Sequence, residues 1–217
     1  MRQVTENCFQ QGNELFTVNL VPGTKVYGEE LRKDKTGELR VWDPNRSKLG
    51  AAILKGLKTV PMTQGSKILY LGASTGTTVS HISDIIGQNG LLYGLEFAER
   101  VFRGLLELSK NRKNIAPLMA DARKIEEYPW VEECDIVFTD ISQPEEVVIF
   151  IRNCNEFLKP GGYGMIAIKS RSIDVIKTPG EVYKDSEEKL KNAGYKIIEI
   201  VDLEPYEKDH ALIVVQR

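Results

Sequence analysis

Four ionisable residues are candidates for a reactive site: Lys48, Asp140, Lys169 and His210. Asp140 and Lys169 each follow a run of apolar residues, and His210 begins another such run near the end of the chain. Amines, carboxylates and imidazoles are the usual side chains for moving protons and for stabilising charge that develops during a reaction. A single residue of this kind is commonly a solvated surface group, so the hypothesis depends on whether the fold brings the four together.

A glycine-flanked loop, LGASTGTT at residues 71–78, is the second feature that could do chemistry. Gly72 and Gly76 allow a tight turn and let the backbone approach a ligand closely. Thr77 and Thr78 open the following helix, whose free N–H groups attract a carboxylate or a phosphate. The loop alone is weak evidence, because glycines at such spacing can serve only the turn.

Acidic residues after the next two apolar runs strengthen the case for a cofactor site. Glu96 lies about 20 residues after Gly76, where a carboxylate can accept hydrogen bonds from both hydroxyls of a ribose. Asp121 and Ala122 follow the third run. An NAD site is the main alternative, but its fingerprint carries a middle glycine under the pyrophosphate, and Ser74 stands at that position. The pattern therefore favours S-adenosylmethionine, whose methionine carboxylate needs no pyrophosphate seat.

Strands that alternate with helices must position these residues. Continuous apolar strands, which indicate a parallel sheet covered on both faces, are predicted at 67–73, 91–97, 115–120, 135–141 and 163–169. Two more strands, at 195–203 and 210–216, are joined only by residues 204–209, a link too short for a parallel crossover. We therefore predict an α/β fold with a mainly parallel, Rossmann-like, seven-stranded sheet and an antiparallel last strand. That arrangement, together with LKPGG at 158–162, resembles the class I methyltransferases.

This topology would bring the four ionisable residues to one edge of the sheet. Chemistry in an open α/β sheet lies outside the carboxyl ends of the strands. Asp140 and Lys169 lie at two of those ends, and the antiparallel last strand begins with His210 at the same edge. Lys48 lies on a helix just before the sheet. We expect the four side chains to converge.

Residues 1–44 are predicted to form a small β-rich domain ahead of the main domain at 45–217. Short apolar stretches at 15–18 and 25–27 are separated by turn signals such as Pro22-Gly23. Asp43 and Pro44 are suited to the N-cap and the first turn of a helix that runs to about Leu57 and links the two parts.

The composition excludes several kinds of protein. With 217 residues, 41% hydrophobic and 28% charged, the chain has enough apolar surface for a globular core. A net charge of −2 gives no overall attraction to polyanions. Cys8, Cys134 and Cys154 are widely spaced without a CxxC pair, so we expect reduced thiols and no metal site. No apolar run reaches membrane length and no secretory signal is evident, so we expect a cytoplasmic protein without membrane contact.

Five blocks spread over nearly the whole chain together resemble the fibrillarin family in its archaeal form. They are RSKLGAAILKGLK (46–58), LYLGASTGTT (69–78), FTDISQP (138–144), IKSRSID (168–174) and EPYEKDHALIV (204–214). The departures are small: Gly50, Ser74, Ser142 and Ser170 stand where alanine is common in the family. None of these departures removes a functional group.

The resemblance implies a methyltransferase that uses S-adenosylmethionine to modify ribose 2′-hydroxyls in pre-rRNA and, in some archaea, tRNA. It implies that a box C/D guide RNA selects the target RNA, and that a Nop-class scaffold protein and a kink-turn-binding ribosomal-type protein are partners. The family's Lys-Asp-Lys-His tetrad falls on Lys48, Asp140, Lys169 and His210. Beside Gly72 and Gly76, its cofactor contacts fall on Thr77, Thr78, Glu96, Phe97, Asp121, Ala122, Asp140, Ile141, Ser142 and Gln143.

Two questions stay open at this level. Lys169 could accept the proton of the ribose hydroxyl if burial and the nearby Lys48 lowered its pKa against the opposing effect of Asp140. Alternatively, Lys169 stays charged and positions the ribose while His210 or water accepts the proton. For the function itself, the alternatives are a class I methyltransferase acting on a small molecule or a protein, and a non-catalytic structural subunit of an RNA–protein particle.

Overall fold

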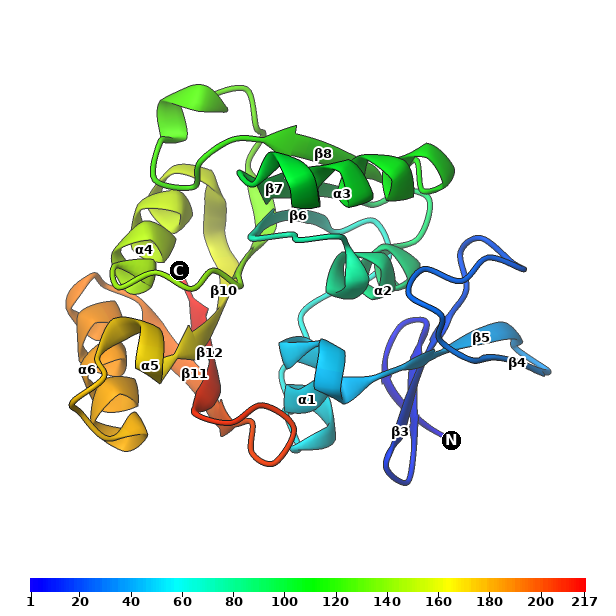
Figure 1. The fold of residues 1–217 in the computed structure, drawn as a ribbon, viewed down its shortest axis with the longest axis horizontal. Coiled ribbons are helices and arrows are strands. Elements are labelled where there is room, and N and C mark those ends of the chain that lie inside the picture. Colours follow the sequence, from blue (N-terminus) through cyan, green and yellow to red (C-terminus); the bar gives the residue numbers. More distant parts are fainter.

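The computed structural model describes residues 1–217, and its N-terminal strands form a small antiparallel sheet (Figure 1). In the order β1-β2-β3-β5-β4, these strands are β1 (Arg2–Thr5), β2 (Cys8–Gln11), β3 (Glu14–Val18), β5 (Gly37–Trp42) and β4 (Leu31–Asp34). The expected β-rich unit is confirmed, but residues 25–27 are not a strand. The amides of Val26 and Tyr27 instead donate to the Glu29 carboxylate at 3.0 and 2.8 Å. The domain boundary at residue 44 stays a prediction.

The second sheet has seven strands in the order β11-β12-β10-β9-β6-β7-β8. They are β6 (Lys67–Leu71), β7 (Leu91–Glu96), β8 (Ile115–Met119), β9 (Cys134–Thr139), β10 (Leu158–Lys169), β11 (Lys196–Asp202) and β12 (His210–Gln216). The pairings among β6 to β10 are parallel, whereas β12 is antiparallel to both β10 and β11. The predicted class I methyltransferase sheet, with its antiparallel last strand, is confirmed.

Helices cover both faces of this sheet (Figure 1). On one face lie α1 (Lys48–Leu54), α2 (Thr77–Ile86) and α3 (Glu99–Asn111), and on the other lie α4 (Glu146–Phe157) and α6 (Pro179–Asn192). The shorter segments are η1 (Pro44–Arg46), η2 (Ile125–Glu127) and α5 (Ser170–Ile173). None of these helices has the length and hydrophobicity that a membrane-spanning helix needs.

The predicted linking helix is interrupted. Asp43 caps the short 3₁₀ helix η1 by accepting a hydrogen bond from Asn45 N, with Pro44 in the first turn as expected. Ser47 is extended, with φ −155° and ψ 112°, and it caps the separate helix α1 by accepting from Gly50 N at 3.2 Å. The expectation of one continuous helix from Pro44 was therefore wrong, because Ser47 ends η1 and starts α1.

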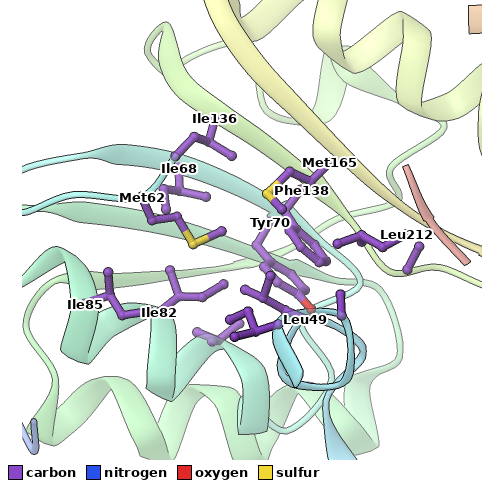
Figure 2. Close-up of a cluster of buried hydrophobic side chains, with 14 of the residues drawn as sticks. Leu49, Met62, Ile68, Tyr70, Ile82, Ile85, Ile136, Phe138, Met165 and Leu212 are labelled. Carbon is purple, nitrogen blue, oxygen red and sulfur yellow. The ribbon is translucent and has the colours of Figure 1, made fainter. Parts of the chain in front are cut away.

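Alternating side chains of the central strands form two hydrophobic cores, one on each face of the sheet. Tyr70 of β6 points to the core that contains α1 and α2, whereas its neighbour Leu71 points to the core that contains α4 and α6. Figure 2 shows the first core, in which Tyr70 stacks on Phe138 of β9 with ring centroids 4.7 Å apart. Leu49 of α1 belongs to the same core, so hydrophobic packing fixes the start of α1 against the sheet.

A buried ionic cluster joins the N-terminal sheet to α2. Asp84 of α2 accepts from Arg40 Nη1 at 2.8 Å and from Arg112 Nη1 at 2.6 Å, and none of the three side chains is more than 1% exposed. His81, also on α2, is fully buried, with Nδ1 2.8 Å from Thr17 Oγ1 of β3. The N-terminal sheet therefore covers the polar face of α2, which would otherwise meet solvent.

Candidate active site

The carboxyl ends of β6 and β9 meet at the point where the strand order reverses, which is where ligands bind in open α/β sheets. Asp140 N donates to Leu71 O at 2.9 Å and extends the pairing of the two strands by one residue. Gly72 lies opposite with φ +83°, and a Cβ added there would collide with the carbonyl oxygen of Asp140. Only glycine lets the loop after β6 approach Asp140 this closely.

Lys48 and Asp140 form an ion pair with 2.8 Å between Nζ and Oδ1, and each side chain remains about one-fifth exposed (19% and 18%). The hydroxyl of Tyr70 lies 3.5 Å from Asp140 Oδ2. Burial alone would lower the pKa of Lys48, but the charge and the hydrogen bond of Asp140, together with the charges of nearby carboxylates such as Glu207, outweigh burial, and the pKa lies above its usual value. Lys48 is therefore a cation at neutral pH, held in place by Asp140.

Lys169, the last residue of β10, lies directly opposite His210, the first residue of β12. Directly opposed residues of an antiparallel pair carry their side chains on the same face. The charges of Lys48 and Lys169 both act on the His210 ring. The structure thus brings the four predicted residues to one edge of the sheet, with the Lys48–Asp140 ion pair as the direct contact among them.

The hydrogen bonding of His210 defines its tautomer. Nδ1 lies 2.6 Å from the carbonyl oxygen of Lys208, and a carbonyl can only accept. Nδ1 therefore carries the hydrogen of the neutral ring, and Nε2 keeps a free lone pair. Burial lowers the pKa of His210, and the nearby lysine charges act in the same direction against the opposing effects of the Lys208 carbonyl and Glu207.

A cavity of about 190 Å³ lies at the same edge. Most of the predicted cofactor residues line it, namely Gly72, Glu96, Phe97, Asp121, Ala122, Asp140, Ile141, Ser142 and Gln143. Glu96 is only 8% exposed, and its two carboxylate oxygens accept from Ser74 N at 3.0 Å and from Ala98 N at 2.9 Å. These bonds fix the carboxylate while leaving lone pairs for the two hydroxyls of a ribose.

Three predicted cofactor residues do not line this cavity. Gly76 has φ +94°, and a Cβ added there would collide with Leu108 of α3. Thr77 lines a separate cavity of about 300 Å³, and Thr78 Oγ1 donates to Ser47 Oγ at 3.0 Å, which ties α2 to the start of α1. A cofactor role for Gly76, Thr77 and Thr78 stays a prediction that depends on their main-chain groups.

One protein family matches the chain from end to end. The family is described as Fibrillarin, and the match covers residues 1–217. This chain belongs to the fibrillarin family. Among sequence relatives, the fibrillarin-like rRNA/tRNA 2′-O-methyltransferase of Thermococcus sibiricus is 54% identical over 204 residues, which are 94% of this chain and 90% of the relative.

Solved fibrillarin structures share the fold of this fibrillarin-family chain. Aeropyrum pernix fibrillarin, in complex with natively bound S-adenosyl-L-methionine, is 48% identical with a TM-score of 0.86, over 93% of this chain and 88% of that one. A chain of a fibrillarin/Nop5p complex is 37% identical with a TM-score of 0.90, over 100% of both chains. The similarity to the chain of the fibrillarin/Nop5p complex therefore includes the N-terminal sheet as well as the seven-stranded sheet.

Some residues at this fibrillarin site were not predicted from the sequence. The cavity is also lined by Ser74, Leu95, Arg123 and Ile149. Arg123 could have been found from its spacing, because it follows Asp121 by two residues and pairs with that carboxylate at 2.7 Å. Nothing in the sequence separates Glu146 from the adjacent Glu145, yet Glu146 is fully buried at the start of α4 and bonded to Lys169 N.

Proposed function

We propose that this chain is an RNA 2′-O-ribose methyltransferase that uses S-adenosylmethionine and works as the catalytic subunit of a box C/D guide RNA–protein complex. One observation carries the proposal. The Lys48–Asp140 ion pair borders a cavity suited to the cofactor, beside the opposed residues Lys169 and His210, in a chain of the fibrillarin family. These are the four residues on which the family's tetrad falls.

The cavity residues fit S-adenosylmethionine by their chemistry. Glu96 presents a fixed carboxylate for the ribose hydroxyls, and Phe97, a residue that is 63% exposed, offers an aromatic ring. Gly72 has no side chain that could intrude between the loop and Asp140. When bound, S-adenosylmethionine supplies an activated methyl group on a positively charged sulfur. The chain's own residues must then hold a 2′-hydroxyl in line with that methyl group, at roughly 3–3.5 Å, and accept its proton.

His210 is the proposed acceptor of the hydroxyl proton. Its Nε2 has a free lone pair at neutral pH, because Nδ1 donates to the Lys208 carbonyl and burial keeps the ring neutral. Lys48 cannot accept a proton at neutral pH, since its pKa is raised and its charged amine is paired with Asp140. The cations Lys48 and Lys169 instead orient the ribose and stabilise the negative charge that develops on its oxygen.

The acid limb of the pH–rate profile tests the role of His210. The pKa of His210 in the folded protein is below the usual 6.5. Turnover should therefore begin to fall only at a pH below 6.5, where the ring becomes charged. His210→Gln should lose this limb and about 10²-fold of the turnover at pH 7. Lys208→Ala, which keeps the backbone carbonyl that His210 binds, is the matched control and should retain the limb. An unchanged acid limb in His210→Gln would exclude His210 as the base.

Guide RNA, a Nop-class scaffold protein and a kink-turn-binding ribosomal-type protein are the proposed partners. With a net charge of −2, the chain attracts polyanions weakly on its own. Base pairing to a guide would select the target, so this subunit has to recognise only the ribose hydroxyl and its backbone. Pre-rRNA, and tRNA in addition, are the proposed targets, and the cytoplasm is the proposed location.

Methyl transfer to a guided RNA, with and without the partners, tests the whole proposal. The reconstituted complex should methylate its target at least about 100-fold faster than the isolated chain, because the partners supply most of the RNA affinity. A target with a single 2′-deoxyribose at the guided nucleotide is the matched control and should accept no methyl group. Turnover that ignores the guide would favour a small-molecule or protein methyltransferase, and a complex that binds S-adenosylmethionine without turnover would favour a structural subunit.

A further inference from the structure

Glu146 is a fully buried carboxyl group at the candidate active site. It is the first residue of α4, and its carboxyl group lies near the end of β10 and the loop after β9. Oε1 accepts a hydrogen bond from Lys169 N at 3.0 Å, and the backbone N–H of Glu146 donates to Gln143 O at 3.1 Å. The second oxygen, Oε2, has no hydrogen-bond partner in the chain.

A buried carboxyl with a free oxygen favours the neutral acid, because an ionised carboxylate needs solvent or donors on both oxygens. Burial raises the pKa of Glu146 to about 8 against the opposing effect of the Lys169 and Gln143 amides. The charge of Asp140 adds to the rise, while Lys48 opposes it. At neutral pH the side chain therefore carries mainly a proton.

We propose that Glu146 is a positioning residue for methyl transfer: as a neutral acid it fixes the Lys169 backbone beside the Lys48–Asp140 pair, and its ionisation switches this arrangement off. This inference rests on the function proposed above. The only direct bond from Glu146 to the tetrad is to the backbone of Lys169, so it acts through that residue rather than on the ribose.

The charges around Glu146 explain why ionisation would matter. Asp140 follows β9, Lys48 starts α1, and Lys169 and His210 lie at the ends of β10 and β12. A second carboxylate beside Asp140 would compete for Lys48, which has a single partner at 2.8 Å. Methyl transfer should therefore fall as Glu146 loses its proton.

Thermal unfolding against pH tests the charge state without RNA or cofactor. The pKa of Glu146 is higher in the folded protein, about 8, than in the unfolded chain, near its usual 4.5, so ionisation destabilises the fold between these values. Glu146→Gln keeps an oxygen for Lys169 N and cannot ionise. Its Tm minus that of the wild type should rise steadily from pH 5 to about 8 and then level off. A constant difference across this range would overturn the neutral-acid assignment.

The pH dependence of kcat in the reconstituted complex tests the positioning role. Wild-type turnover should fall about tenfold for each pH unit above pH 8, and Glu146→Gln should keep its pH 7 rate within about twofold and lose this alkaline limb. Glu145→Gln removes the same charge at the adjacent, exposed residue and should retain the limb. If Glu146→Gln kept the wild-type limb, the positioning role would be wrong. Failure of wild-type turnover itself would count against the proposed function, and the unfolding experiment would still decide the charge state.

Discussion

Replacing Asp140 with alanine is expected to reduce kcat roughly 10³-fold at saturating S-adenosylmethionine. The carboxylate is the partner of Lys48 at 2.8 Å, and it borders the cavity proposed to hold S-adenosylmethionine. Without it, the Lys48 amine loses the group that fixes its position, and the Tyr70 hydroxyl loses its neighbour at 3.5 Å. A misplaced Lys48 would both orient the ribose less well and stabilise the charge on its oxygen less well. The two reductions in rate would multiply. Single-turnover methylation of a guided RNA measures the effect.

A matched control lies at the other end of the same strand. Asp135, near the amino end of β9, pairs with Lys159 at 2.8 Å, the same distance as the Asp140 pair. Asp135→Ala removes an equivalent carboxylate from the opposite edge of the sheet and should leave kcat within about twofold of the wild type. Near-normal turnover in Asp140→Ala, or an equal loss in Asp135→Ala, would contradict a role specific to the carboxyl edge.

Much of the fold could be predicted because its strongest constraints are local. Strands that are apolar on both faces indicated a covered parallel sheet, and the short link at 204–209 required β11 and β12 to be antiparallel. Two details depended on hydrogen bonds that no periodicity reveals. The Ser47 hydroxyl caps α1 and so divides the predicted linking helix into two parts. The Glu29 carboxylate accepts hydrogen bonds from the amides of Val26 and Tyr27, which are then not available for strand pairing.

The sequence could predict that the four ionisable residues lie at one edge of the sheet, but not the contacts that they make. Strand topology indicates that Asp140, Lys169 and His210 share an edge, because parallel strands end together. It does not indicate which lysine pairs with Asp140, or that the His210 Nδ1 bonds a carbonyl and leaves Nε2 free. Glu146 was missed for a related reason. A glutamate in the first turn of a helix normally faces solvent, and only the packing of α4 against β9 and β10 buries it.

The burial of the polar face of α2 could not be predicted from the sequence either. Ser80, His81 and Asp84 occupy the side of the helix away from the sheet, where solvent is the usual neighbour. In this fold the N-terminal sheet lies there instead, and Arg40 of β5 reaches both Ser80 and Asp84. The small sheet is thus held to the larger one by ionic and hydrogen-bonding contacts as well as by the shared core of Leu15 and other apolar residues.

Asp84→Ala is expected to lower the free energy of unfolding by about 3–5 kcal/mol, which is roughly 6–20 °C in Tm for a chain of this size. The carboxylate accepts from Arg40 at 2.8 Å, Arg112 at 2.6 Å and Thr17 at 2.7 Å, all in the buried interior. Its removal leaves two buried guanidinium groups without their shared counter-ion, and this desolvation penalty exceeds the lost attraction itself. Asp185→Ala is the control, because it breaks an ion pair with Lys177 whose side chains are both more than 40% exposed, and it should cost under about 1 kcal/mol. Equal thermal shifts in the two variants would mean that this buried cluster does not hold the N-terminal sheet in place.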